Sequence, residues 1–247
     1  MNTKKRILFA AFALFLLAVI AAVCFFQFTA VGYRMTVPYR SSFVEIADHV
    51  FMNRNHSGST EEMIRLIDSA RERVKEFYGD LRCLEDTVII LCDDDRLIAK
   101  LGGDHDTHTT YFPARKHYIS VSDEYFNIDI LAHELTHAEL HTRLSESAQR
   151  KMPTWFDEGI ALQNDYREQY SFEAWREQTD HGSHTVALED MDEASEFYAG
   201  TKEDRRFRYL NAKHEVSGWV EAHGRQGLLE LIDKLNHGEE FFSAYDE

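Results

Sequence analysis

A run of 22 uncharged, mostly apolar residues from Ile7 to Phe28 restricts the fold of this 247-residue chain more than any other feature. Its length suits a helix that crosses a bilayer, because a helix satisfies its own backbone hydrogen bonds in lipid. Three basic residues precede the run, and this charge places the N-terminus in the cytoplasm and the remainder outside. We therefore predict a cytoplasmic N-terminus at residues 1–6, a transmembrane signal anchor at residues 7–28, and a single-pass cell-membrane protein with an extracytoplasmic domain.

A cleaved signal peptide is the alternative interpretation of this run, and it would make the protein secreted. The apolar core of a signal peptide is normally about 7–15 residues long, so the length of the run favours the anchor. A possible small-x-small cleavage pattern nevertheless follows at residues 30–32. Pro38 and a pair of serines argue against a continuous helix after the run. Residues 29–41 are therefore predicted to be a linker, and residues 42–247 the exported domain.

The charge balance of the exported part restricts its partners. The chain has 27 Lys and Arg against 43 Asp and Glu residues, and the three basic residues before the apolar run leave a net charge of −19 for the remainder. Such a surface repels nucleic acid and anionic lipid headgroups. We therefore expect no nucleic-acid partner, and we expect attachment to the membrane through the N-terminal helix.

Two cysteines, Cys83 and Cys92, lie outside the apolar run. In an oxidising compartment they could form a disulfide. Cys92 also ends an apolar segment of the kind that forms a buried strand, which suits two free, buried thiols equally well. Both interpretations stay open, because the sequence does not place the two Cα atoms relative to each other.

The hydropathy pattern predicts a mixed α/β segment followed by helices, which is an α+β fold class. Apolar residues at helical spacing indicate a helix over residues 61–78, and Gly79 ends it. The alternation of residues 117–122 suits a half-exposed strand, and an edge strand offers free backbone groups to an extended peptide. Further strands are expected at residues 50–52, 87–91 and 109–112, a surface loop at 104–108, and helices at 96–101, 172–178, 195–198, 204–223, 226–235 and 239–245.

The most informative motif is His133-Glu134-Leu135-Thr136-His137, which lies in a predicted helix from about residue 127 to residue 144. Residues four apart lie on one face of a helix, so His133 and His137 can bind one metal ion. Glu134 lies beside the first ligand and can act as general base on a water that the metal activates. Catalytic zinc takes three protein ligands and leaves one position open, so a third ligand is required.

One source of the third ligand is excluded. The metzincin pattern would place a Gly and a His three and six residues after His137, but Leu140 and Arg143 occupy these positions. The segment Trp155-Phe156-Asp157-Glu158-Gly159-Ile160-Ala161 instead resembles the W-x-x-E-G-x-A segment of gluzincin zinc metallopeptidases. The resemblance implies that Glu158, which has 20 residues between it and His137, is the third zinc ligand.

A second similarity extends the resemblance to the peptidase MA-like branch. The stretch from Tyr209 to Gly224, with the pattern Y-x-N-A-x-x-x-V-x-x-W-V-x-x-x-G, is similar to the C-terminal Tyr-x-Gln-Ser helix of that branch. It implies that Tyr209 donates a hydrogen bond to the oxyanion of the reaction, and an ordinary core tyrosine is the alternative interpretation. His214 and Tyr198 are the other candidate donors. The whole resemblance covers roughly residues 85–245.

These similarities imply a zincin-like domain, in which a small mixed sheet and an active-site helix precede a mainly helical C-terminal lobe. The implied function is a membrane-anchored, extracytoplasmic zinc metallopeptidase that hydrolyses peptide bonds in a peptide or protein substrate. No exopeptidase G-A-M-E-N-like motif is visible, so an endopeptidase is expected. The implied site consists of catalytic Glu134 and Tyr209, with Zn²⁺ on His133, His137 and Glu158.

The alternative function is a non-catalytic, zinc-stabilised and membrane-tethered binding or assembly module. Glu134 argues against it, because a structural zinc site needs no base and fills all four positions.

Four residues near the ligands are expected to support the site. Asp157 and Asp165 are candidates to orient a ligating imidazole through a hydrogen bond. His141 continues the His133 face by two turns, and we expect it around the ligands or on the helix surface rather than on the metal. Trp155 is expected to pack beneath the site.

Overall fold

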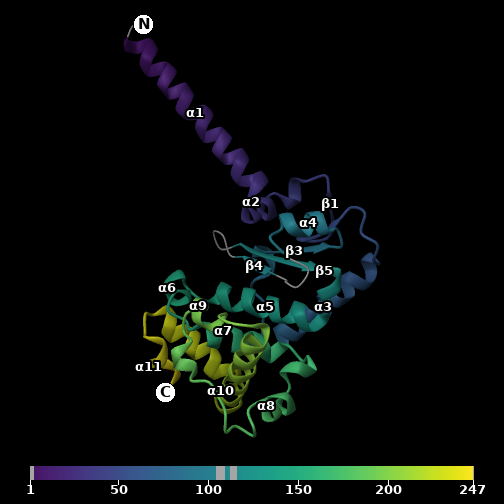
Figure 1. The fold of residues 1–247 in the computed structure, drawn as a ribbon, viewed down its shortest axis with the longest axis vertical. Coiled ribbons are helices and arrows are strands. Elements are labelled where there is room, and N and C mark those ends of the chain that lie inside the picture. The colour runs from purple at the N-terminus through teal and green to yellow at the C-terminus, as the bar shows by residue number, and fades with distance from the viewer. Residues whose placement is uncertain (1–2, 104–108, 112–115, 247) are drawn as a thin grey trace. The chain divides into compact units, whose positions relative to one another are not determined.

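The structure is a computed structural model in which residues 3–103, 109–111 and 116–246 are described (Figure 1). These residues form a mixed α+β fold, as predicted, with a small mixed sheet and an N-terminal apolar helix. The chain divides into two compact units, Met1–Gly58 with Val88–Tyr125 and Ser59–Thr87 with Phe126–Glu247. The loop predicted at residues 104–108 lies outside the described residues.

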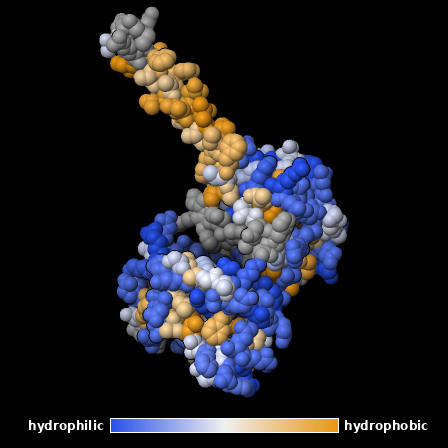
Figure 2. All heavy atoms as spheres, in the orientation of Figure 1, coloured by the Kyte–Doolittle hydropathy of each residue, from blue (hydrophilic) through white to orange (hydrophobic). Residues whose placement is uncertain are grey.

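The first unit begins with α1 (Thr3–Phe28), and its segment Ile7–Phe28 is long and apolar enough to cross a membrane. Almost all side chains of this segment are exposed, and Figure 2 shows hydrophobic side chains along its length. Within the described ranges it is the one helix of this kind. The predicted apolar helix is therefore confirmed, and both a membrane anchor and a signal sequence satisfy this observation.

Residues 29–41, predicted as a linker, are largely helical. They contain α2 (Ala30–Met35) and the 3₁₀ helix η1 (Val37–Tyr39). Tyr33 is buried in the core of the first unit, which gives the segment an apolar anchor point. Pro38 lies in the first turn of η1, where a proline is tolerated because its missing N–H would have no helical partner. The proline that suggested an open linker thus lies in the second of two packed short helices.

A mixed sheet forms the framework of the first unit. Its strand order is β1-β2-β3-β5-β4, with antiparallel pairs β1–β2 and β4–β5 and a parallel pair β2–β3. The strands are β1 (Phe43–Ala47), β2 (Val50–Asn53), β3 (Thr87–Cys92), β4 (Thr109–Tyr111) and β5 (His117–Ser122).

The prediction that residues 117–122 form a half-exposed edge strand is wrong. These residues form β5, which lies between β3 and β4 and is buried at all six positions. The short strand β4 pairs with it, so that Thr110 lies opposite Ile119. Alternation identifies which residues share a face, but small polar residues such as Ser120 are also found in an interior. The pattern therefore did not show that both faces of β5 are covered.

One face of β3 contributes to the core of the first unit. Val88, Ile90 and Cys92 alternate along the strand and therefore share a face. They pack in one buried cluster with Ile98 of α4 (Asp95–Lys100) and with side chains from α2, β1, β2 and β5. The short helix η4 (Asp123–Tyr125) closes the unit.

The second unit is built of helices. They are α3 (Thr60–Tyr78), η2 (Leu84–Asp86), α5 (Ile128–Arg143), α6 (Glu146–Gln149), α7 (Thr154–Ala161), η5 (Leu162–Asn164), η6 (Glu168–Tyr170), α8 (Phe172–Gln178), η7 (Leu188–Asp190), α9 (Ala194–Phe197), α10 (Lys202–Asn236) and α11 (Phe241–Tyr245). The predicted helices that fall in this unit are confirmed, with small differences at their ends.

Local sequence signals explain where these helices begin and end. The Asn127 side chain accepts hydrogen bonds from the backbone N–H groups of Asp129 and Ile130, and so caps α5. Gly79 follows α3 with a φ of 94°, which is unfavourable for a residue with a Cβ. Gly224, with a φ of 64°, interrupts α10 where the sequence predicted a break between two helices.

Candidate metal centre

The helix α5 places the two histidines of the H-E-x-x-H motif side by side. His133 and His137 are one turn apart, and their Nε2 atoms lie 3.1 Å from each other. His133 is buried, and the side chain of His137 is only 11% exposed. Two nitrogen atoms at this distance in a buried position can share a proton or a metal ion between them.

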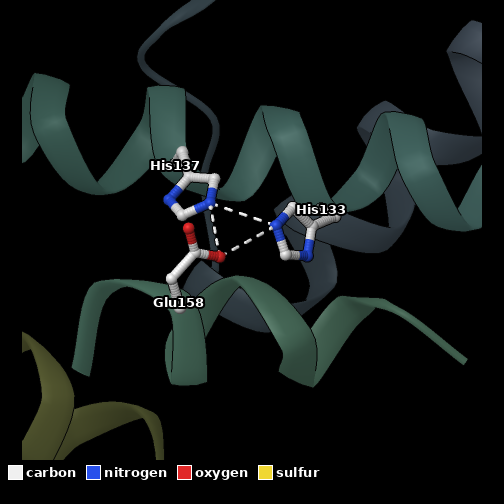
Figure 3. A group of neighbouring side chains, drawn as sticks. All are labelled: His133, His137 and Glu158. Atoms are coloured by element: carbon white, nitrogen blue, oxygen red, sulfur yellow. Dashed lines mark hydrogen bonds and ion pairs between the residues drawn. The ribbon is translucent and has the colours of Figure 1, made fainter. Parts of the chain in front are cut away.

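The helix α7 brings Glu158 to the same point (Figure 3). Glu158 Oε2 lies 3.3 Å from His133 Nε2 and 3.4 Å from His137 Nε2, and the carboxylate is buried. Figure 3 shows the three side chains pointing toward one another from the two helices. The expected convergence of His133, His137 and Glu158 is therefore present, and the group can hold a metal ion.

The spacing of the three donor atoms fits a four-coordinate metal ion. Zinc bonds to nitrogen and oxygen are about 2.0–2.2 Å long, which places two ligand atoms of a tetrahedron about 3.3–3.6 Å apart. The separations of 3.3 and 3.4 Å agree with these edges, and the separation of 3.1 Å between the two histidine nitrogens is slightly shorter. A tetrahedron has four corners, so this donor set leaves one corner for a water or a substrate.

Asp157 joins the ligand His137 to a third histidine. Its Oδ1 lies 2.7 Å from His137 Nδ1, and its Oδ2 lies 2.8 Å from His141 Nε2. An ionised carboxylate only accepts hydrogen bonds, so His137 carries a proton on Nδ1, and its Nε2 faces the centre. The predicted contact of Asp157 with the imidazole of a candidate ligand, His137, is confirmed. His141 contacts this carboxylate and is not part of the group formed by His133, His137 and Glu158. With His137 and Asp157 it forms a second group of possible ligands.

The predicted role of Asp165 is less well supported. Asp165 Oδ2 lies 3.7 Å from His133 Nδ1, which is longer than a hydrogen bond. The same carboxylate accepts hydrogen bonds from the guanidinium of Arg167 at 2.5–3.0 Å. Asp165 therefore places a negative charge near His133, while its hydrogen bonds go to Arg167.

The electrostatics of the group favour an ionised carboxylate next to a cation. Burial alone would raise the pKa of Glu158, but His137 and His133 lower this pKa well below its usual range. Burial lowers the pKa of His137, but the carboxylates of Asp157 and Glu158 raise it by more. The pKa of His137 therefore lies well above its usual value. The carboxylates therefore stabilise positive charge at His137 Nε2, where a bound cation would also lie.

Glu134 and Tyr209 lie within electrostatic range of this group. Glu134 follows His133 on α5 and is buried. Burial raises the pKa of Tyr209 most, and Glu158, Tyr170 and Glu134 raise this pKa further. Their expected roles as general base and oxyanion donor stay predictions.

The two alternative oxyanion donors occupy different places. The Tyr198 hydroxyl donates a hydrogen bond to Glu158 Oε1, so it contacts a metal-ligand candidate directly. His214 stacks on Trp175 with ring centroids 3.5 Å apart. It lines a separate pocket of about 170 Å³, to which Tyr170 and Lys213 also contribute. His214 therefore belongs to this pocket.

The helix α7 is held close to α10 by a glycine. A Cβ on Gly159 would lie 2.8 Å from the carbonyl oxygen of Ala212 and would also overlap Val216. The glycine of the W-x-x-E-G-x-A segment thus permits the close packing that fixes Glu158. Trp155, as expected, is buried; its ring packs against Phe241 of α11.

Buried hydrogen bonds fix α5 in the second unit. Thr136 Oγ1 accepts a hydrogen bond from Asn164 Nδ2 at 2.9 Å, which ties the motif helix to the segment after α7. Glu139 Oε2 accepts from the backbone N–H groups of Arg82 and Cys83 at 2.8 and 2.9 Å. Sequence reasoning missed the contribution of Asn164, because no local pattern marks a partner 28 residues away.

A third group of possible ligands lies in the first unit, and its hydrogen bonds favour a structural role. It consists of His56, Asp93 and Asp123. His56 Nδ1 accepts a hydrogen bond from the backbone N–H of Gly58, so the proton of the neutral ring lies on Nε2, which faces Asp123 Oδ1 at 2.8 Å. Asp93 accepts from Ser57 and Asn53.

Neither the protein-family models nor the curated proteins compared with the chain give a match. The functional assignment therefore rests on the geometry and chemistry of the centre.

Proposed function

We propose that the chain is a membrane-anchored zinc metallopeptidase of gluzincin type, with a zincin-like catalytic domain outside the cytoplasm. The observation that carries this proposal is the convergence of His133 Nε2, His137 Nε2 and Glu158 Oε2 at tetrahedral spacing. Glu134, on the same helix as the two histidines, supplies a buried carboxylate beside them. The apolar segment of α1 supports attachment to the membrane.

The donor set supports zinc in a catalytic rather than a structural role. Two imidazoles and one carboxylate are a ligand set that catalytic zinc uses, whereas structural zinc is usually closed by four protein ligands rich in cysteine. Both cysteines outside α1, Cys83 and Cys92, are free and buried, and neither belongs to the group. When bound, zinc acts as a Lewis acid toward a carbonyl oxygen and lowers the pKa of water.

Three protein side chains have separate roles in peptide hydrolysis. Asp157 holds His137 in the tautomer whose Nε2 faces the centre. The Glu134 carboxylate takes a proton from the attacking water and passes it to the nitrogen of the departing amine. The Tyr209 hydroxyl donates a hydrogen bond to the oxyanion that forms from the scissile carbonyl. The substrate is a peptide or protein, and endopeptidase action is proposed.

The test combines metal analysis with cleavage assays on the full chain in detergent. We expect about one zinc per chain in the native protein and in Glu134→Gln, and cleavage of casein or a peptide library by the native protein only. Loss of a general base should lower the rate by about 10²–10⁴-fold. Glu158→Ala should lose zinc. Glu146→Gln, which changes an exposed glutamate on α6, is the matched control and should keep both properties.

Two results would contradict this proposal. Equal cleavage by the native protein and Glu134→Gln would exclude the mechanism. Stoichiometric zinc without cleavage by either form would favour a zinc-stabilised binding or assembly module.

A further inference from the structure

We infer that Tyr198 is a positioning residue that fixes the third metal ligand, Glu158. The Tyr198 hydroxyl donates a hydrogen bond to Glu158 Oε1, whereas Glu158 Oε2 faces the two histidine Nε2 atoms at 3.3 and 3.4 Å. One oxygen of the Glu158 carboxylate thus binds Tyr198, and the other faces the two histidines. The inference rests on the metal centre of the proposed function and concerns how that centre is held.

This division favours binding of the metal through one oxygen. A hydrogen bond from a hydroxyl to an ionised carboxylate is short and strong, and it holds the plane of the carboxylate. With Oε1 occupied by Tyr198, Oε2 remains as the ligand atom. Groups that orient metal ligands in this way typically contribute about 10–100-fold to metal affinity.

The backbone on both sides of Tyr198 is held by Arg208 of α10. One guanidinium nitrogen, Nη1, donates to the carbonyl oxygen of Phe197 at 3.1 Å and to that of Ala199 at 2.5 Å. Phe197 is fully buried, and its ring packs edge-on against the ring of Tyr209. The backbone that carries Tyr198, from Phe197 to Ala199, is therefore held in place, and a positioning role requires this.

The chain just before Tyr198 is joined at Asp192 to the start of α7, the helix that carries Glu158. The backbone N–H of Thr154 donates to the carbonyl oxygen of Asp192 at 2.8 Å, and Trp155 Nε1 donates to the Asp192 carboxylate at 3.2 Å. The tyrosine and the glutamate thus lie on segments that are connected at a second point. This connection limits relative movement of the two partners.

Tyr198 and Tyr209 take different roles in this arrangement. Their ring centroids are 6.5 Å apart, but a phenol has one proton to donate, and Tyr198 donates it to Glu158. In the described part of the chain the Tyr209 hydroxyl has no hydrogen-bond partner. The Tyr198 hydroxyl therefore binds the metal ligand Glu158, and the Tyr209 hydroxyl remains available to bind the substrate.

The test measures the affinity of the full chain for zinc in detergent, by competition with a chromophoric chelator. Tyr198→Phe removes one oxygen and keeps the ring, and we expect its zinc affinity to fall about 10–100-fold. The control Tyr209→Phe removes the neighbouring hydroxyl and should keep the native affinity. In the cobalt-substituted protein, Tyr198→Phe should also change the visible absorption spectrum, because the mode of Glu158 binding changes.

A second variant separates positioning from general damage to the fold. Arg208→Gln should weaken zinc binding in the native background and have little further effect in Tyr198→Phe, because both act through one hydrogen bond. Thermal unfolding of the metal-free forms shows whether Tyr198→Phe leaves the fold intact, as expected. Equal zinc affinity of the native protein and Tyr198→Phe would overturn the inference, as would an equal loss in Tyr209→Phe.

The outcomes distinguish this inference from the proposed function. Native zinc binding with unchanged affinity in Tyr198→Phe would overturn the positioning role and leave the peptidase proposal standing. Weaker zinc binding in Tyr198→Phe without peptide cleavage by the native protein would support the positioning role and contradict the peptidase proposal.

Discussion

The carboxylate of Asp157 accepts a hydrogen bond from Nδ1 of His137 at 2.7 Å. Asp157 immediately precedes Glu158 on α7, so one helix supplies both a candidate ligand and the carboxylate that contacts a second candidate ligand, His137. The second Asp157 oxygen binds His141, one turn beyond His137 on α5. The Asp157 carboxylate thus joins α7 to α5 through hydrogen bonds with His137 and His141.

Asp157→Asn should weaken zinc binding by about 10–100-fold, because the amide no longer provides a negative charge for His137. Chelator competition on the full chain measures this change. The control is His141→Gln, which removes only the outer partner of Asp157 and should cause a smaller loss. An equal loss in both variants would contradict the lesser, outer role of His141.

Gly159→Ala should destabilise the fold by about 1–3 kcal/mol, because the new methyl group is forced against the Ala212 carbonyl oxygen and Val216. The matched control is Gly218→Ala in α10, where an added Cβ meets nothing within 4 Å. Alanine is favoured over glycine in a helix, so this variant should be more stable by about 0.5–1 kcal/mol. Thermal unfolding of the full chain in detergent compares the two. A stabilised Gly159→Ala would contradict the close packing of α7 against α10.

The parts of the site that could be predicted from sequence are those set by local geometry. The four-residue spacing of His133 and His137 and the cap at Asn127 operate within one helix, so a single segment contains the information. Glu158 could be placed because a motif with a known spacing marks it. The contact between Tyr198 and Glu158 could not be predicted, because it joins segments 40 residues apart through tertiary packing.

The same limit explains the errors in the fold. The burial of β5 depends on its position between β3 and β4, and alternation within residues 117–122 does not contain this information. The packing of Tyr33 likewise depends on partners in β1, β3 and α4. The expected oxyanion role of Tyr209 needs a bound substrate to test it.

The full chain should remain in the membrane pellet after extraction with alkaline carbonate, because the apolar segment Ile7–Phe28 can span the bilayer. A truncated chain that begins at Thr29 should appear in the soluble fraction and serves as control. Protease added outside intact cells should digest the domain of the full chain and spare a cytoplasmic marker protein. A soluble mature chain that begins after residue 32 would instead identify the segment as a cleaved signal peptide.

The two buried thiols should react slowly with iodoacetamide at pH 8 in the native chain. Burial, and for Cys83 also the charge of Glu139, raises the pKa of Cys83 to about 12. Burial raises the pKa of Cys92 to about 11. Only the thiolate reacts, and an unfolded cysteine has a pKa of about 8.5, so unfolding should expose both thiols to rapid alkylation. A Cys24→Ser background removes the thiol of α1, and mass spectrometry counts the alkyl groups.

These raised pKa values also set the direction of the pH dependence of stability. The folded state favours the neutral thiols, so their contribution to stability is complete below about pH 8.5, the pKa of an unfolded thiol. It should fall as the pH rises toward 11 and 12, because the unfolded chain releases protons first. Cys92→Ala should reduce this alkaline loss, measured as thermal unfolding between pH 8 and 11. A denatured, unreduced chain without two alkylatable thiols would show a disulfide and contradict the burial of Cys83 and Cys92 as free thiols.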